Sequence, residues 1–427
     1  MWRPARTCNR VDAARLMLLG LAIVSAGCAR PAPRPSTNAP ATPTVDARVA
    51  RVSLGTVPTA ALSATAPWRL IAAEGQVVAR GDSGARVSLT TVRGALRVAE
   101  PGRPAREVSS PLSLTVATAH GAAVFNGRRY RGGLWVTAAD STVLVINHVD
   151  LESYLRGVVP RELGVRGAAD RAALEAQAVA ARSYAVTRLG NRSRMFDLSA
   201  TTSDQVYGGV DAENALADAA VAATDGLVLA YDGRIVSAPY HSTCGGTTAE
   251  PTELWRSRAE PFLQRVSDKI PGSDRYYCDI APRFRWERTW RADTLTAIVE
   301  RYLRPYAQVP PGPIGDVRDV STEGRTPSGR TTAVVIETER GRYRLQGNNV
   351  RYVLRSPGGE LLNSTYFSPE VIPGSDGRLA RLTIRGFGYG HGVGMCQWGA
   401  IGRARAGQDF RTILRTYFPG TSVERAY

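Results

Sequence analysis

The sequence has 427 residues, 43% of them hydrophobic, which is enough to bury one large core or two modest ones. Its formal net charge of +16 favours anionic partners. The basic residues form no aromatic-rich cluster and no helix-turn-helix pattern, so we expect no nucleic-acid partner.

The first 45 residues are predicted to be an export segment followed by a tether. Residues 1–15 carry four arginines, and residues 16–26 form an apolar run shorter than the ~20 residues that span a bilayer. Ser25-Ala26-Gly27-Cys28 resembles a lipobox, although an aliphatic residue is usual in place of Ser25. We therefore predict a signal peptide over 1–27, lipidation of Cys28 and a disordered tether over 28–45. Plain secretion with a nearby cleavage site is the alternative.

Such a segment predicts an exported protein of the cell envelope. It would be lipid-anchored to a membrane and face the periplasm or the wall. Removing residues 1–27, which hold four arginines and one aspartate, leaves a net charge of about +13. Anionic wall polymers and phospholipids are then the first partners that the protein would meet.

The next part of the chain predicts a β-rich N-terminal section over residues 46–110. It consists of short runs in which apolar and polar residues alternate, separated by Gly, Asp or Pro every eight to twelve residues. This pattern is typical of antiparallel strands. The same pattern continues to Val149, and the segment 127–132 (GRRYRG) predicts a hairpin.

From residue 150 onward helices and strands are mixed. Leu151–Leu155 is predicted to start a short helix that Pro160 interrupts, and Asp170–Leu189 predicts a strong alanine-rich helix on which Gln177 and Tyr184 face the same way. The further predicted elements are a helix over 212–224, a hairpin closed by Asp232-Gly233, a helix over 292–303, strands over 314–345 and 379–385, a Gly-rich loop over 386–400, and a last helix that ends at Pro419-Gly420. The predicted fold class is α+β, mostly antiparallel β-sheets with a central alanine-rich helix.

Several motifs occur in a fixed order. They are VDLESYLRGVVPREL at 149–163, LEAQAVAARSYAV at 174–186, DQVY at 204–207, HSTCGG at 241–246 and GHGVGMCQWGA at 390–400. Together they resemble the stage II sporulation protein D and amidase enhancer family over roughly residues 110–427. This resemblance implies one catalytic domain over 111–427. The chain departs from the family pattern at Leu163-Gly164, where Met-Pro is usual, at Glu175, where lysine is common, and at Ser183, where threonine is usual.

The resemblance implies a lytic transglycosylase whose catalytic residue is Glu162. Breaking a glycosidic bond needs a group that protonates the leaving oxygen, and a carboxyl does so once its surroundings raise its pKa. One glutamate suffices, because a hydroxyl of the sugar itself attacks the anomeric carbon. The alternative is that Glu162 is a surface residue in a first helical turn after Pro160. Glu152 is expected to form a structural ion pair, with Arg182 as its partner.

The remaining candidate site residues are expected to contact the glycan. Gln205 and Tyr207 would offer a hydrogen bond and a stacking face to a sugar ring, against an alternative of ordinary loop packing. His391 would orient Glu162 or a sugar hydroxyl, with a tight structural turn as the alternative. Further substrate-binding candidates are Gln177, Tyr184, Gln397 and Trp398.

The folded part holds an odd number of cysteines, namely Cys244, Cys278 and Cys396. His241, Cys244 and Cys278 are a possible zinc site, although a structural zinc needs four ligands. In an oxidising compartment a Cys244–Cys278 disulfide is the alternative, and free thiols are a third. A nucleophilic pair of Cys396 with His391 is discounted, since no orienting acid is apparent.

The function that the resemblance implies is therefore cleavage between N-acetylmuramic acid and N-acetylglucosamine in peptidoglycan, in intact or in peptide-stripped strands, with a 1,6-anhydro product. Two rivals remain open. One is a non-enzymatic amidase enhancer that binds peptidoglycan and stimulates an N-acetylmuramoyl-L-alanine amidase. The other is a zinc hydrolase built on His241 and Cys244.

Overall fold

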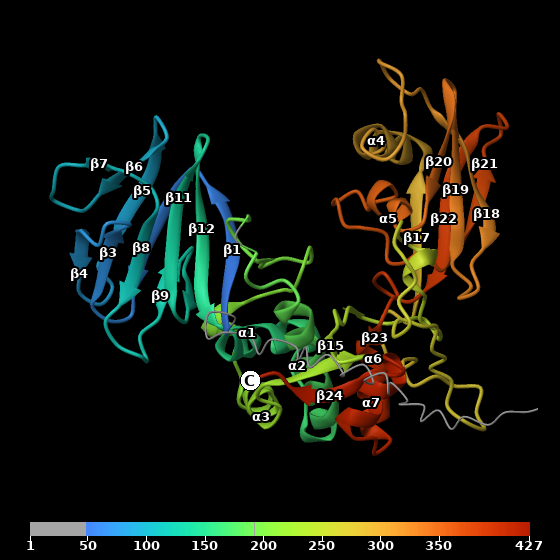
Figure 1. Ribbon diagram of the computed structural model, residues 1–427. Coiled ribbons are helices and arrows are strands. Elements are labelled where there is room, and N and C mark those ends of the chain that lie inside the picture. The colour runs from blue at the N-terminus through green and yellow to red at the C-terminus, as the bar shows by residue number, and fades with distance from the viewer. Residues whose placement is uncertain (1–47, 192) are drawn as a thin grey trace, which may run out of the picture. The chain divides into compact units, whose positions relative to one another are not determined.

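The computed structural model describes residues 48–191 and 193–427 (Figure 1). The predicted signal peptide, the tether and Cys28 lie outside the described residues. Within these ranges no helix combines the length and the apolar character needed to cross a bilayer. Helices are mixed with mainly antiparallel sheets, so the predicted α+β class is confirmed.

Residues 49–150, drawn in blue to teal in Figure 1, form a β-sandwich to which one short strand from further along the chain is added. Its first sheet has the order β13 (Leu198–Ser199), β1 (Val49–Val57), β12 (Thr142–Asp150), β11 (Gly133–Ala139), β8 (Leu112–Val116), β3 (Trp68–Ala72) and β4 (Val77–Gly81). The second has the order β10 (Arg128–Tyr130), β9 (Ala123–Phe125), β2 (Thr59–Ala64), β5 (Val87–Val92), β6 (Ala95–Ala99) and β7 (Arg106–Val108). Alternate residues of β2, β3 and β6 are buried between the sheets, as the alternation of apolar residues predicts.

Two sequence-based predictions need correction in this sandwich. The predicted domain boundary between residues 110 and 111 falls inside it, because β8 pairs with β3 and β9 pairs with β2. The hairpin predicted at 127–132 instead spans Ala123 to Tyr130 and turns at Asn126 and Gly127, which both have positive φ angles. That backbone conformation is the one a two-residue hairpin turn requires.

The strand β12 leads directly into the helix α1 (Leu151–Leu163), whose N-cap is Asp150. Its side chain accepts a hydrogen bond from the backbone N–H of Ser153. The helix continues through Pro160, contrary to the predicted interruption. A proline costs one backbone hydrogen bond within a helix, but only three residues of α1 follow it and its side chain is buried. As a result Glu162 lies in the last turn of α1 and not in a first turn.

The predicted alanine-rich helix is α2 (Arg171–Val186), preceded by the 3₁₀ helix η2 (Ala168–Asp170). Its small side chains are buried on most sides, and α1, α3 (Ala215–Ala223), α6 (Gln397–Arg405) and α7 (Phe410–Tyr417) all pack against it. Gly157 of α1 makes room for the Tyr207 ring, since a Cβ there would lie 2.5 Å from that ring. The α2 helix is therefore the centre of the main hydrophobic core.

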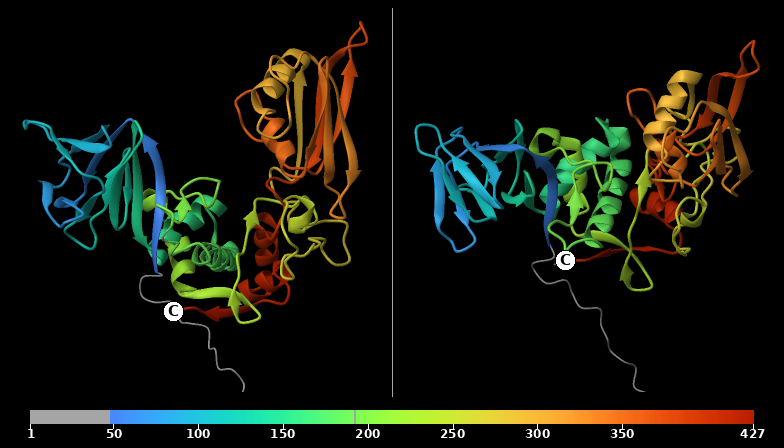
Figure 2. Two further views of the ribbon diagram at one scale, coloured as in Figure 1. Left: turned by 45° about the horizontal axis from the view of Figure 1, so that its top comes forward. Right: turned by 90° about the horizontal axis from the view of Figure 1, so that it is seen from above.

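Short strands complete this core. The predicted hairpin is β14 (Leu227–Tyr231) and β15 (Arg234–Ile235), and β14 also pairs with β24 (Ser422–Arg425), a strand that the sequence patterns did not predict. Figures 1 and 2 show β24, in red, beside this yellow-green hairpin. The pair β16 (Tyr240–His241) and β23 (Met395–Cys396) is parallel. The remaining 3₁₀ helices are η3 (Gly209–Ala212) and η4 (Pro251–Glu253).

Residues 285–387 build a second hydrophobic core, although one domain was predicted for 111–427. Its sheets have the orders β17 (Arg285–Arg291), β22 (Leu379–Phe387), β21 (Phe367–Pro373) and β18 (Val317–Arg325), β19 (Thr331–Thr338), β20 (Gly341–Gln346). The helices α4 (Ala292–Tyr302) and α5 (Asn349–Val353) pack on them (Figure 1). The segment enters and leaves through neighbouring strands, since Arg285 pairs with Phe387.

Candidate active site

Glu162 is held at the end of α1 by three donors. Its Oε1 accepts a 2.7 Å hydrogen bond from the backbone N–H of Val206, and its Oε2 lies 3.4 Å from the amide nitrogen of Gln397. A third donor, the Tyr240 hydroxyl, lies close to the carboxylate and favours its charged form. The three donors come from three distant segments, so the carboxyl has a fixed position and is half-buried.

A chain of buried polar groups supports the Tyr240 hydroxyl. The Tyr154 hydroxyl donates to Gln205 Oε1 at 3.0 Å, and Gln205 Nε2 donates to the Tyr240 oxygen at 3.0 Å and to the Ala181 carbonyl at 3.2 Å. Because Tyr240 accepts from Gln205, its own proton is free to point at Glu162. This network fixes the Tyr240 hydroxyl beside Glu162. Buried hydrogen-bond networks of this kind restrict the rotation of the side chains in them.

Burial raises the pKa of Glu162 above its ordinary value, since a charge is poorly solvated in this position. The hydrogen bonds from Val206, Gln397 and Tyr240 oppose that effect, because they favour the charged form. The net direction is upward. A carboxyl in this state keeps its proton to higher pH than an exposed glutamate, which suits a general acid.

Glu162 lies in the wall of a groove with a volume of about 1310 Å³. Aromatic side chains of the groove include Tyr184, Tyr231, Trp255, Tyr352 and Tyr389, and its arginines are Arg188, Arg234, Arg258 and Arg351. Trp255 is 36% exposed, and its ring lies 5.2 Å from the ring of His391. The groove is larger than the pockets of ~300–1,000 Å³ that hold single small molecules, so a segment of a polymer fits its size.

The groove includes four of the predicted glycan-site residues, namely Glu162, Tyr184, His391 and Gln397. The Tyr184 hydroxyl donates to Asp204 at 2.9 Å. Gln397 also lies 3.3 Å from Gln177, as amide to carbonyl, so Gln177 supports the site from inside the core. The predicted common face of Gln177 and Tyr184 on α2 is therefore consistent with their contacts.

Four predicted contact residues lie elsewhere. Gln205 and Gln177 are fully buried and Tyr207 is 3% exposed, so they cannot touch a sugar in this structure. Tyr207 instead donates to Asn147 at 3.0 Å, which corresponds to the packing alternative. Trp398 is not part of the groove surface, and the guanidinium of Arg166 lies 4.7 Å from its ring. Motif position alone did not separate residues that line the groove from those that support it.

His391 does not contact Glu162, contrary to one expected role. Its Nδ1 accepts a 3.1 Å hydrogen bond from the Val393 N–H, and the Tyr240 backbone lies close to the ring. Burial lowers the pKa of His391 to about 3, so the ring is neutral at physiological pH. His391 is held by backbone in a tight turn and forms one face of the groove beneath Trp255.

The three cysteines of the folded part come together, but not with His241. The Sγ atoms of Cys244 and Cys278 are 3.5 Å apart and are not bonded as a disulfide. Cys396 and Asp268 complete a cluster whose four ligand atoms all lie within 4.8 Å of one another. His241 is not part of this cluster, and its Nδ1 lies 3.1 Å from the Val393 carbonyl. The predicted ligand set of His241, Cys244 and Cys278 therefore needs correction.

Burial raises the pKa of the Cys244 and Cys396 thiols well above their ordinary value. Hydrogen bonds from these two thiols lower the pKa of Cys278 to about 3. Since Cys396 is buried and its sulfur accepts backbone hydrogen bonds, it does not form a nucleophilic pair with His391.

The predicted ion pair between Glu152 and Arg182 is confirmed. Arg182 Nε lies 2.6 Å from Glu152 Oε1, and Nη2 lies 2.7 Å from Oε2. The Tyr427 hydroxyl also donates to Glu152. Both carboxylate oxygens of Glu152 are therefore bound to structural partners. Glu162 is the glutamate of α1 that faces the groove.

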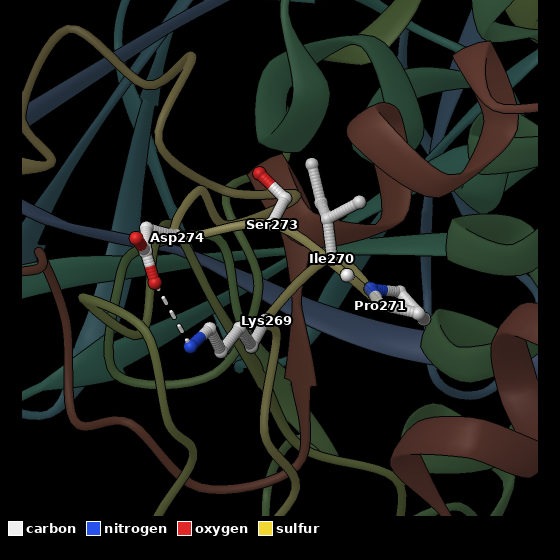
Figure 3. A pocket seen from close by; sticks show the side chains of 6 residues that line it. Lys269, Ile270, Pro271, Ser273 and Asp274 are labelled. Carbon is white, nitrogen blue, oxygen red and sulfur yellow. Dashed lines mark hydrogen bonds and ion pairs between the residues drawn. The ribbon is translucent and has the colours of Figure 1, made fainter.

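A second hollow of about 360 Å³ is formed by the turn 269–274. Figure 3 shows Lys269 and Asp274 directed toward each other, with 3.2 Å between the ammonium and the carboxylate. None of the predicted site residues lines it. We assign no function to this surface turn.

Two family models match parts of the chain. A family model described as stage II sporulation protein matches residues 139–231, which include Glu162 and Val206. A model described as a domain of unknown function (DUF8618) matches residues 249–394, which include Trp255, Asp268 and Cys278.

Three relatives cover most of the chain. An uncharacterised protein of Brachyspira hyodysenteriae is 29% identical over 304 residues, which cover 70% of this chain and 73% of that protein. The amidase enhancer of Bacillus subtilis is 30% identical over 290 residues, which cover 63% of this chain but 40% of the enhancer. Stage II sporulation protein D of Bacillus subtilis is 29% identical over 297 residues, which cover 66% of this chain and 76% of that protein.

Proposed function

Because this chain belongs to the stage II sporulation protein D and amidase enhancer family, we propose that it cleaves peptidoglycan glycan strands as a lytic transglycosylase. The observation that carries this proposal is the half-buried carboxyl of Glu162, which has a raised pKa and lies in the wall of a large groove. Both features are what a general acid for glycoside cleavage needs.

Glu162 would act first as acid and then as base. Its proton passes to the glycosidic oxygen between N-acetylmuramic acid and N-acetylglucosamine, and the bond to the anomeric carbon breaks. The hydroxyl at C6 of the muramic acid residue attacks that carbon, and the Glu162 carboxylate accepts the hydroxyl proton. The product is a 1,6-anhydro sugar, and the acid is restored without water. No second carboxylate is required.

The sides of the groove suit a glycan. Trp255 offers an exposed ring face for the apolar face of a sugar. Arg188 and Arg258 lie along the groove and favour anionic groups. Strands without peptides expose the lactyl carboxylate of each muramic acid, whereas intact strands carry an amide there. This charge favours peptide-stripped glycan as the substrate.

The direct test uses purified protein with intact and with amidase-stripped glycan, and detects anhydro-ended fragments by mass spectrometry. Glu162→Gln is expected to lower the rate ~100-fold or more, because the proton donor is lost. Glu175→Gln is the matched control, since that glutamate pairs only with Arg171 on the surface of α2. Equal product release by wild type and Glu162→Gln would overturn the assignment.

The amidase enhancer relative supports one alternative, in which the chain binds peptidoglycan and stimulates an N-acetylmuramoyl-L-alanine amidase. In that case neither wild type nor Glu162→Gln releases anhydro sugars, and both raise the amidase rate when added. The zinc hydrolase rival has less support, because Cys244 is fully buried and a catalytic zinc keeps an open position.

We place the protein at the cell envelope, attached to a membrane through lipidated Cys28. Labelling with a radioactive fatty acid is expected to mark the wild type and not Cys28→Ser. Cys8→Ser is the control, because Cys8 would be removed with the signal peptide. Label on both variants would exclude Cys28 as the anchor and leave plain secretion.

A further inference from the structure

We propose that Cys244, Cys278, Cys396 and Asp268 bind a structural divalent metal ion of the zinc type. This inference is independent of the glycan activity. It differs from the set expected from the sequence in two ligands, since Cys396 and Asp268 replace His241.

The four ligand atoms have the spacing of a tetrahedral site. With Zn–S distances of about 2.3 Å, tetrahedral ligands are separated by about 3.8 Å from one another. The Cys244 and Cys278 sulfurs are 3.5 Å apart, the Cys244 sulfur lies 3.4 Å from Asp268 Oδ2, and no pair of the four atoms exceeds 4.8 Å. Small shifts of the side chains suffice to surround an ion.

Backbone N–H groups are directed at two of the sulfur atoms. The Cys396 sulfur accepts backbone hydrogen bonds from Cys244 at 3.2 Å and Gly399 at 3.3 Å, and the Cys244 sulfur accepts one from Gly246 at 3.4 Å. A neutral thiol is a weak acceptor, so three backbone donors directed at two sulfurs are better matched to charged ligands. Buried thiolates in turn need a cation close by.

Asp268 is positioned as a ligand whose second oxygen is already occupied. Its Oδ1 accepts a 2.6 Å hydrogen bond from the Tyr417 hydroxyl and lies 3.1 Å from Arg403 Nη2. Oδ2 therefore faces the sulfurs. Such outer partners orient the ligands of metal sites. Gly399 makes room for this carboxylate, since a Cβ there would lie 2.1 Å from Asp268 Oδ2.

The ion would join segments that lie far apart in sequence. Cys244 follows β16, Asp268 and Cys278 lie on the loop before β17, and Cys396 is the N-cap of α6. All four residues are buried, so the site is closed and has no open position for substrate. Gln397, which contacts Glu162, is the next residue after Cys396. The ion would thereby fix the start of the helix that carries Gln397.

The test measures metal in the full protein, purified after export in buffers without chelator. We expect about one zinc per chain by inductively coupled plasma mass spectrometry. We also expect this zinc to be released when a mercurial reagent titrates the thiols. Cobalt(II) exchanged into the protein is expected to give the sulfur-to-cobalt absorption and the intense visible bands of a tetrahedral thiolate site.

Variants separate this ligand set from the alternatives. Cys278→Ser and Asp268→Asn are expected to weaken metal binding at least tenfold, whereas His241→Gln keeps the metal. Loss of metal in His241→Gln with retention in Cys278→Ser would overturn the proposal. So would wild-type protein without metal, whether peptide mapping finds a Cys244–Cys278 disulfide or three free thiols. If the variants do not fold, the cobalt spectrum of the wild-type protein tests the proposal. Absence of the tetrahedral thiolate bands would then overturn it.

Discussion

The amide of Gln397 lies 3.4 Å from the carboxylate of Glu162, although 235 positions separate the two residues in the chain. The contact is made possible because α1 and α6 both pack on α2. Gln397 is thus a positioning residue, which acts on the reaction through Glu162.

Gln397→Leu is predicted to shift the pH profile. The amide donor lowers the pKa of Glu162, so its removal raises that pKa further. The protonated acid then persists to higher pH, and the alkaline limb of kcat/KM moves upward in pH. Glycan cleavage followed over pH 4 to 9 measures this shift. Gln346→Leu, exposed on β20, is the control, and an unchanged or downward-shifted limb in Gln397→Leu would contradict the assignment.

Glu162→Gln is predicted to stabilise the fold at neutral pH while it abolishes cleavage. A carboxyl whose folded pKa is raised binds its proton more tightly when folded, so wild type loses stability as pH rises from the unfolded pKa of ~4.3 through the folded pKa. The glutamine variant avoids that loss. Thermal unfolding at pH 3.5 and 7.5 is expected to show a gain only at the higher pH. A gain of equal size at both values would mean that burial of charge is not its origin.

Glu152→Ala is predicted to be strongly destabilising. Arg182 is fully buried, so removal of its partner leaves an unpaired charge in the core, at a cost of ~3–5 kcal/mol. Glu175→Ala breaks an exposed pair with Arg171 four residues away on α2, and such pairs contribute ~0.3–0.5 kcal/mol. Urea unfolding of both variants measures the difference, and similar losses would show that burial of Arg182 is unimportant.

Trp255→Ala is predicted to weaken glycan binding about three- to tenfold, because the exposed ring face in the groove is lost. Trp135→Ala is a matched control, since Trp135 is 37% exposed on β11 and is not a groove residue. Binding of stripped glycan fragments, measured by calorimetry, separates the two. Equal affinity of both variants would remove Trp255 from the binding surface.

Local patterns predicted local structure well. The alanine-rich segment forms α2, and Asp232-Gly233 closes its hairpin with both residues at positive φ angles. The ion pair of Glu152 with Arg182 was also predicted, because both residues lie at regular helical positions in their motifs. These features depend on neighbours in sequence or on strong motif order.

Features that depend on distant segments were missed. Asp268 carries no motif of its own, and only the folded loop brings it to the cysteines. Tyr240 adjoins the His241 motif, and this neighbourhood was the one sequence signal for its contact with Glu162. The burial of Gln205 and Tyr207 could not be predicted either. The same polar motif is compatible with contact to a ligand and with a buried hydrogen-bond network.

The pairing of Arg285 with Phe387 means that the intervening hundred or so residues leave the main core and return at the same point. A segment with adjacent ends can be gained, lost or exchanged during evolution without rerouting the rest of the chain. Side chains that bond back to the main core oppose such an exchange, and Arg330 is the largest example. Arg330 reaches from this segment to the carbonyls of Cys244 and Thr247, so any replacement must fill its place or leave those buried acceptors unsatisfied.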